Sequence, residues 1–133
     1  MVVDDEALIR WSIEARCRRR GFTVLSVDTG EAALDKLALA RVDVMILDVS
    51  LPGIDGVTTL ARALQMNPNL PVIMISAHCT DDFVAEVLKQ GAAEFLSKPF
   101  PLELLDAAVE RALAGAKTVR RPAGGPGWVL GLA

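Results

Sequence analysis

The sequence predicts a doubly wound α/β domain, in which a five-stranded parallel sheet carries helices on both faces. Five short, β-branched runs alternate along the chain with five longer helical patterns. The runs are continuously apolar rather than alternating, which is typical of strands buried on both faces. The chain has 133 residues and is 52% apolar, enough for one core and one domain. Strict alternation of strand and helix predicts parallel strands joined by right-handed crossovers.

The expected strands are bounded by turn signals. They comprise Val2–Val3, Thr23–Val27, Val42–Leu47, Val72–Ile75 and Glu94–Leu96. Because only three residues precede Asp4, the first strand is expected to be short.

A helical pattern follows each strand. The first, Glu6–Arg20, ends on three arginines before Gly21, and cations in a last turn followed by glycine form a helix stop. The second spans Glu31–Ala40. Thr80 is placed to cap the fourth helix, and Pro101 suits the first position of the fifth. The third helix is predicted from an apolar stripe of Val57, Leu60, Ala61 and Leu64.

The composition changes after the fifth helix. Residues 1–114 form the predicted domain, and residues 115–133 hold five of the ten glycines together with Pro122 and Pro126. We expect this tail to be a linker or a disordered end, although Trp128 and its apolar neighbours could dock weakly on a surface.

Charge and composition narrow the partners and the location. The formal charge is only −3, which argues against a globally basic nucleic-acid binder. A basic cluster at Arg16 and Arg18–Arg20 fits a helix end better, since no aromatic residues for base stacking are interleaved. No apolar run approaches membrane-spanning length, and no secretion signal is seen. Cys17 and Cys79 lack metal-type spacing, so we expect a reduced, cytoplasmic protein.

Chemistry-bearing residues gather at the carboxyl ends of the predicted strands, where doubly wound sheets bind ligands. Asp4 and Asp5 follow the first strand, and Asp48 ends the third. Ser76 ends the fourth strand, and Lys98 follows the fifth. Clustered carboxylates call for a cation such as Mg²⁺ or Mn²⁺. A carboxylate can also attack phosphorus, with the cation and Lys98 neutralising the transferring group.

Four segments, taken in order, resemble the receiver domain of two-component response regulators over residues 2–114. They are Val2-Val3-Asp4-Asp5-Glu6, Leu47-Asp48-Val49-Ser50-Leu51-Pro52-Gly53-Ile54-Asp55-Gly56, Ile75-Ser76-Ala77 and Phe95-Leu96-Ser97-Lys98-Pro99-Phe100. The resemblance implies a flavodoxin-like (βα)5 fold with strand order 2-1-3-4-5. Ser76-Ala77-His78 is similar to receivers of enhancer-binding, nitrogen-regulation-type transcription regulators.

The resemblance also implies a role for each site residue. Asp48 is the implied phosphoacceptor. Mg²⁺, for which Mn²⁺ can substitute, would be held by Asp5, Asp48 and the backbone carbonyl of Ser50, with Asp4 acting through a water molecule. Lys98 would bind the phosphoryl oxygens, and its peptide bond to the following proline would be cis.

Further side chains would respond to the phosphoryl group or act on it. Ser76 would hydrogen-bond it and draw its loop inward, and Phe95 would turn inward as the aromatic switch where relatives often have tyrosine. His78 and Ser50 would flank the group and set the rate of its hydrolysis. The surface formed by the fourth helix, fifth strand and fifth helix would then be the output.

The resulting prediction is a phosphorylation-activated switch in two-component signalling. It would take phosphate from a sensor histidine kinase or phosphotransfer protein, and it would catalyse only its own phosphorylation and dephosphorylation. A homodimer through the output surface and a downstream effector domain are further candidate partners, whereas direct nucleic-acid and membrane contacts are not expected.

Three other classes compete with this interpretation. A haloacid-dehalogenase-type phosphatase needs an aspartate two residues after its nucleophile, where this chain has Ser50. A flavodoxin-like nucleotide binder needs a hydroxyl- or glycine-rich loop after the first strand, where this chain has Asp4-Asp5-Glu6. A degenerate, phosphorylation-independent interaction module would not need the complete acidic set and Lys98.

Overall fold

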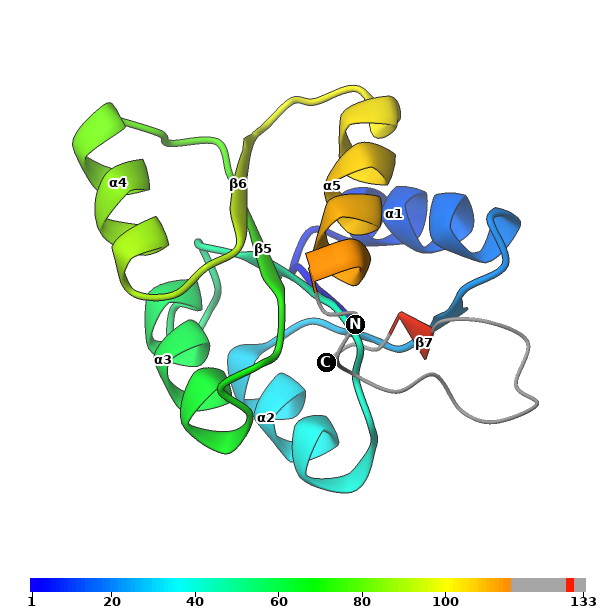
Figure 1. Ribbon diagram of the computed structural model, residues 1–133, viewed down its shortest axis with the longest axis horizontal. Helices are drawn as coiled ribbons and strands as arrows, with labels where there is room; N and C mark the ends of the chain where they lie inside the picture. Colours follow the sequence, from blue (N-terminus) through cyan, green and yellow to red (C-terminus); the bar gives the residue numbers. More distant parts are fainter. Residues whose placement is uncertain (116–128, 131–133) are drawn as a thin grey trace.

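Five parallel strands form the central sheet of the computed structural model, which describes residues 1–115 and 129–130 (Figure 1). The strands lie in the order β3-β1-β4-β5-β6. Their bounds are Val2–Val3 for β1, Ser26–Val27 for β3, Met45–Asp48 for β4, Val72–Ser76 for β5 and Glu94–Ser97 for β6. β3 is the C-terminal part of the expected second strand, and β4, β5 and β6 are the expected third, fourth and fifth strands. The predicted order 2-1-3-4-5 is therefore confirmed.

That second strand differs from the prediction by being split. Thr23–Val24 forms β2, which pairs in parallel with β7 (Val129–Leu130), while β3 pairs with β1. From the sequence, residues 115–133 are expected to be a linker or a disordered end. Of these, the structure describes only Gly115 and β7, so the rest of the tail, including Trp128, lies outside the described residues. The third strand also begins later than expected, at Met45.

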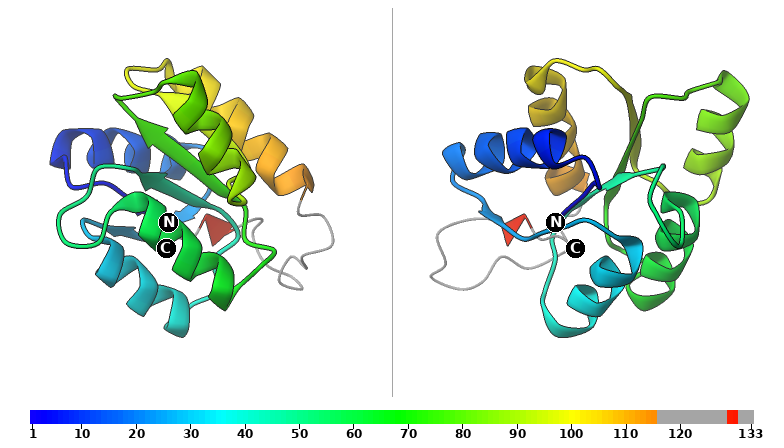
Figure 2. Two further views of the ribbon diagram at one scale, coloured as in Figure 1. Left: turned by 90° about the vertical axis from the view of Figure 1, so that its left-hand side faces the viewer. Right: turned by 180° about the vertical axis from the view of Figure 1, so that it is seen from behind.

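Five helices cover the two faces of the sheet. They are α1 (Ala7–Arg19), α2 (Gly30–Leu39), α3 (Gly56–Met66), α4 (Asp81–Lys89) and α5 (Leu102–Gly115). Helices α1 and α5 lie on one face, and α2, α3 and α4 lie on the other (Figures 1 and 2). The predicted cap is confirmed: Thr80 Oγ1 accepts a hydrogen bond from the backbone N–H of Phe83 at 3.2 Å. Pro101 lies just before α5 rather than at its first position.

The central strands β4 and β5 send alternate side chains into two cores. Met45, Leu47 and Met74 pack with residues of α2, α3 and α4. Ile46 and Ile75 pack with residues of α1 and α5. All of these side chains are fully buried, which explains why the strands are apolar on both faces.

Ion pairs join α1 to α5. Arg16 binds Asp106 with an Nη2–Oδ2 distance of 2.6 Å, and Arg20 binds both Asp106, at 3.0 Å, and Glu110. Two members of the basic cluster therefore bind carboxylates on the neighbouring helix. Among the residues that the structure describes, no helix is both long and apolar enough to cross a membrane.

Candidate functional site

The carboxyl edge of the sheet brings the predicted acidic residues together. Val3 of β1 is paired with Leu47 of β4, so that Asp4 and Asp48 follow them side by side. Both carboxylates are buried, with 0% of Asp4 and 2% of Asp48 exposed. Two like charges at such close range in a buried place need a cation.

Lys98 supplies that positive charge within the protein. Its ammonium Nζ lies 2.9 Å from Asp4 Oδ2 and 3.0 Å from Asp48 Oδ2. A third carboxylate, that of the exposed Glu6, lies 3.3 Å away. The Lys98–Pro99 peptide bond is cis, as predicted.

Burial and charge perturb the pKa values of the central pair. Burial, reinforced by the negative charge of Asp4, raises the pKa of Asp48 to about 6, against the opposing hydrogen bonds from Lys98 and the Ser50 backbone N–H. Burial by itself lowers the pKa of Lys98, but hydrogen bonds to Asp4 and Asp48 outweigh it, so that the pKa lies above its ordinary value. Lys98 therefore stays charged, and the carboxyl of Asp48 is mostly ionised at neutral pH.

The turn after β4 depends on Gly56. The backbone N–H of Gly56 donates to the carbonyl of Val49 at 2.8 Å, which folds α3 back against the end of the strand. A Cβ atom on Gly56 would lie 2.1 Å from the carbonyl oxygen of Asp48 and 2.6 Å from Cα of Val49. Both obstacles are backbone atoms, so only glycine lets α3 begin this close to Asp48. Asp55 caps α3 by accepting from the N–H of Thr58 at 2.8 Å.

The donor set of this edge fits a hard divalent cation. Asp4, Glu6 and Asp48 each offer one carboxylate oxygen, and these oxygens all lie within 4.8 Å of one another. All-oxygen, carboxylate-rich sites are those that Mg²⁺ and Mn²⁺ prefer. Asp5 is exposed and lies outside that group, whereas Glu6, to which the sequence reasoning assigned no role, lies within it. The sequence feature that could have indicated a role for Glu6 is its position directly after Asp4 and Asp5, as a third consecutive carboxylate.

The hydroxyl of Ser76 is bound within its own loop. Ser76 is 1% exposed, its Oγ accepts from the N–H of His78 at 3.1 Å and donates to the His78 carbonyl at 3.3 Å. Ser50, in the turn after β4, and His78, in the Ser76 loop, are both exposed. The ring of Phe95 is half-buried and meets that of Phe83 edge to face, with centroids 6.0 Å apart.

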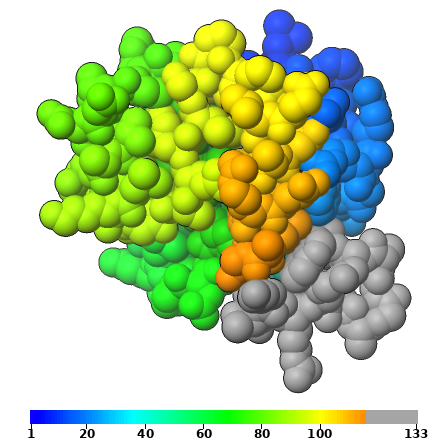
Figure 3. Space-filling view, turned by 45° about the horizontal axis from the view of Figure 1, so that its top comes forward, coloured from blue at the N-terminus to red at the C-terminus, as the bar shows by residue number. Residues whose placement is uncertain are grey.

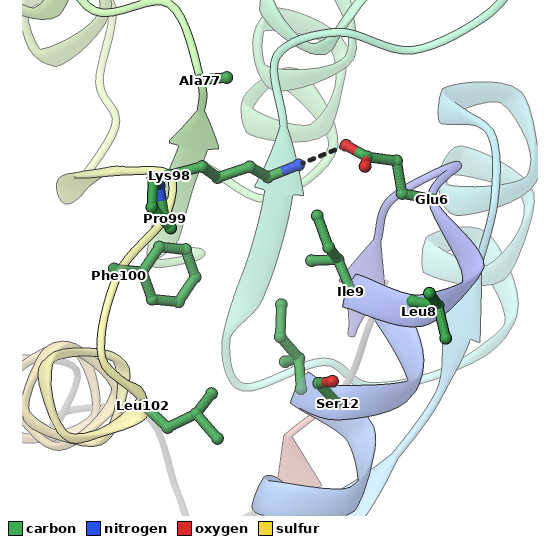
Figure 4. A pocket seen from close by; sticks show the side chains of 10 residues that line it. Glu6, Leu8, Ile9, Ser12, Ala77, Lys98, Pro99, Phe100 and Leu102 are labelled. Atoms are coloured by element: carbon green, nitrogen blue, oxygen red, sulfur yellow. Dashed lines mark hydrogen bonds and ion pairs between the residues drawn. The ribbon is translucent and has the colours of Figure 1, made fainter.

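Two cavities open beside the site. One, of about 550 Å³, lies between α1 and the segment that joins β6 to α5, with the Lys98–Glu6 ion pair at its edge (Figure 4). Its walls are mainly apolar, from Ile9, Phe100 and Leu102. The other, of about 520 Å³, lies between the turn after β4, the Ser76 loop and α4.

Buried carboxylates bridged by a lysine, at the carboxyl edge of a parallel sheet, are the arrangement that the resemblance to receiver domains predicts. Comparison with known proteins agrees: the model of the response regulator receiver domain family matches residues 1–110. The chain belongs to that family.

The relatives are of the NtrC type. The DNA-binding transcriptional regulator NtrC of Escherichia coli (strain K12) is 36% identical over 121 residues, which cover 91% of this chain and 26% of the relative. The response regulator FleR of Pseudomonas aeruginosa is 35% identical over 114 residues, 85% of this chain and 24% of the relative. The chain thus spans about a quarter of the length of these relatives.

Solved structures agree with the fold. NtrX from Brucella abortus in complex with ADP has a TM-score of 0.83 and 31% identity, covering 88% of this chain and 27% of that chain. The receiver domain of NtrX from Brucella abortus has a TM-score of 0.81 and 31% identity, covering 85% of this chain and 96% of that chain. The protein is a receiver domain of a response regulator in two-component signalling.

Proposed function

We propose that this receiver accepts a phosphoryl group on Asp48 from a sensor histidine kinase or a phosphotransfer protein, in a Mg²⁺-dependent reaction. The observation that carries the proposal is the position of Lys98, whose ammonium bridges Asp4 and Asp48 at the carboxyl edge of the sheet. A charged lysine beside a buried carboxylate suits a site through which an anionic group passes.

The transfer uses the ionised carboxylate as nucleophile. An oxygen of Asp48 forms a bond to phosphorus while the bond from phosphorus to the donor breaks, and the donor leaves with that electron pair. Lys98 exchanges part of its contact with Asp48 for the phosphoryl oxygens. Bound Mg²⁺ would supply charge neutralisation. By the resemblance it would be held by Asp5, Asp48 and the Ser50 carbonyl, with Asp4 acting through water, whereas the carboxylate oxygens that lie within 4.8 Å of one another are those of Asp4, Glu6 and Asp48.

Loss of the phosphoryl group follows by attack of water on phosphorus. Ser50 and His78 are exposed and line the same cavity beside Ser76, which supports a role for them in setting the rate at which water reaches the phosphoryl group. Each cycle modifies and restores the domain itself, which makes it a self-modifying switch rather than an enzyme that turns over a separate substrate.

The switch connects this centre to the face formed by α4, β6 and α5 (Figure 3). Ser76 would exchange its bonds to His78 for a phosphoryl oxygen, and Phe95 would follow it inward. The face already exposes apolar side chains, with Leu88 41% and Leu104 51% accessible. We propose this face as the contact for a second copy of the domain or for an effector domain that regulates transcription, with no direct nucleic-acid contact by the receiver.

Acetyl phosphate tests the proposal directly. The wild-type protein and Asp48→Asn are incubated with the reagent with and without Mg²⁺, and intact masses are recorded. A phosphate adduct on the wild type that requires Mg²⁺ and is missing from Asp48→Asn supports the proposal. An adduct of equal yield on both proteins, or none on either, refutes it.

A further inference from the structure

We propose that Phe83, on α4, is a positioning residue that holds the ring of Phe95 outside the cavity beside Ser76 and so sets the balance of the switch. This inference rests on the proposed function, and it assigns a role to a residue that lies outside the phosphoacceptor site. The contact at issue is the edge-to-face pair of the two phenylalanine rings, with centroids 6.0 Å apart and planes at 89°.

The local structure fixes Phe83 where it can take this role. Its backbone N–H donates to Oγ1 of the capping residue Thr80, in the first turn of α4. The helix cap therefore ties the backbone of Phe83 to the end of the loop that carries Ser76. Phe95 stands on β6 in register with Met74 of β5, so its backbone is fixed by the sheet.

The cavity of about 520 Å³ is the space that the Phe95 ring would enter. Phe83 forms part of its wall, together with Ser50, Ser76 and His78, whereas Phe95 is not among the described residues that line it. Phe83 thus touches both the cavity and the ring of Phe95. Entry of the ring into this cavity would break its contact with Phe83.

Two sets of contacts hold the observed arrangement, which we call the loop-bonded state. Ser76 Oγ is hydrogen-bonded to the main chain of His78, and the ring of Phe95 packs edge to face against that of Phe83. A phosphoryl group competes for the Ser76 hydroxyl and would free the loop, but the ring pair must still be broken before Phe95 moves inward. An edge-to-face pair contributes about 0.5–1.5 kcal/mol, a factor of about two to ten in an equilibrium constant.

The sign of the effect follows from this competition. Because the edge-to-face contact is made in the loop-bonded state and must be broken before Phe95 moves inward, its removal favours the inward state and tightens the binding of a phosphoryl mimic. The increase in affinity cannot exceed the factor by which the contact favoured the loop-bonded state. Phe83→Leu and Phe95→Leu remove the same contact, so their effects on the balance between the two states are not additive.

The test is a double-substitution cycle with Phe83→Leu and Phe95→Leu, and Val84→Ala serves as the matched control. Val84 is the next residue on α4, is also half-buried and takes no part in the ring contact. Urea unfolding of all variants checks that each is folded and measures the coupling of the two rings in the full chain. Beryllium is then titrated in excess fluoride and Mg²⁺, and the affinity for beryllofluoride, a phosphoryl mimic, is read from amide NMR.

We expect Phe83→Leu to bind beryllofluoride about two- to tenfold more tightly than wild type, with Val84→Ala unchanged and the two phenylalanine substitutions non-additive. Wild-type affinity or weaker binding in Phe83→Leu overturns the inference while leaving the proposed function intact. Additive effects in both the unfolding and the binding cycles overturn it as well. A wild-type protein that does not bind beryllofluoride at all overturns the proposed function, and the inference with it.

Discussion

Replacing Asp48 by asparagine should make the metal-free protein more stable at neutral pH, although it removes the proposed phosphoacceptor. Burial and the charge of Asp4 raise the pKa of Asp48 from its ordinary value of 3.8 to about 6. At 1.36 kcal/mol per pKa unit, ionised Asp48 costs the folded state about 3 kcal/mol. Asparagine keeps the shape without the charge, so we expect a gain of about 2–3 kcal/mol, or roughly 10 °C in Tm.

The pH dependence identifies the cause. The pKa of Asp48 is raised in the folded state, so the cost is absent below the unfolded value, develops as the pH rises and is fully present above the folded value of about 6. Urea unfolding of both proteins in EDTA, at about pH 4 and about pH 8, should therefore show the gain only at the higher pH. Mg²⁺ should stabilise the wild type and not the variant. A variant that is less stable at the higher pH, or equally more stable at both, would refute the reasoning.

Three other changes have defined outcomes. Lys98→Gln leaves the buried carboxylates of Asp4 and Asp48 without their cation, so urea unfolding near neutral pH should show a loss of about 3 kcal/mol, and unchanged stability would contradict the assignment. Asp106→Asn removes the partly exposed pairs with Arg16 and Arg20 and should cost about 0.5–1 kcal/mol in low salt. The pKa of Asp106 is lowered, chiefly by its hydrogen bond from Arg16, so this difference should be present at neutral pH and vanish as the pH falls through the folded value; a difference that persists in acid would rule out the ion pairs as its source. Gly56→Ala should cost about 1–3 kcal/mol in the same unfolding assay and slow acetyl phosphate labelling, because the new Cβ meets the Asp48 carbonyl; wild-type stability and rate would show that the turn can adjust freely.

The alternation of apolar runs and helical patterns was enough to predict a parallel sheet and the edge at which the site lies, whereas the strand order came from the resemblance to receiver domains. Parallel strands with right-handed crossovers leave few arrangements, and every one of them that places the first strand beside the third brings Asp4 next to Asp48. The Thr80 cap was also predictable, because an N-cap is a local property of its own few residues.

Contacts between residues distant in the sequence could not be predicted in the same way. Arg16 and Asp106 are 90 residues apart, and their pairing depends on how α1 and α5 pack. The basic cluster was therefore interpreted only as a helix end. Phe83 and Phe95 likewise meet because of the rotation of α4 against β6, which no local pattern encodes.

Side-chain direction at the first turn was the other unpredictable feature. The three consecutive carboxylates after β1 point different ways: Asp4 is fully buried, while Asp5 is exposed. Glu6 turns back to Lys98, helped by its own backbone N–H, which donates to Asp4 Oδ1 at 2.9 Å. Residue type indicated an acidic site here, but only the geometry distinguishes which carboxylates reach Lys98.

The most direct test of the central claim is to locate the phosphoryl group. The protein is treated with acetyl phosphate and Mg²⁺, the acyl phosphate is reduced with borohydride, and peptides are mapped by mass spectrometry. Reduction confined to Asp48, and lost when Mg²⁺ is withheld, is the result that the account predicts. Reduction at another carboxylate with Asp48 intact, or labelling of Asp48 that does not depend on Mg²⁺, would contradict it.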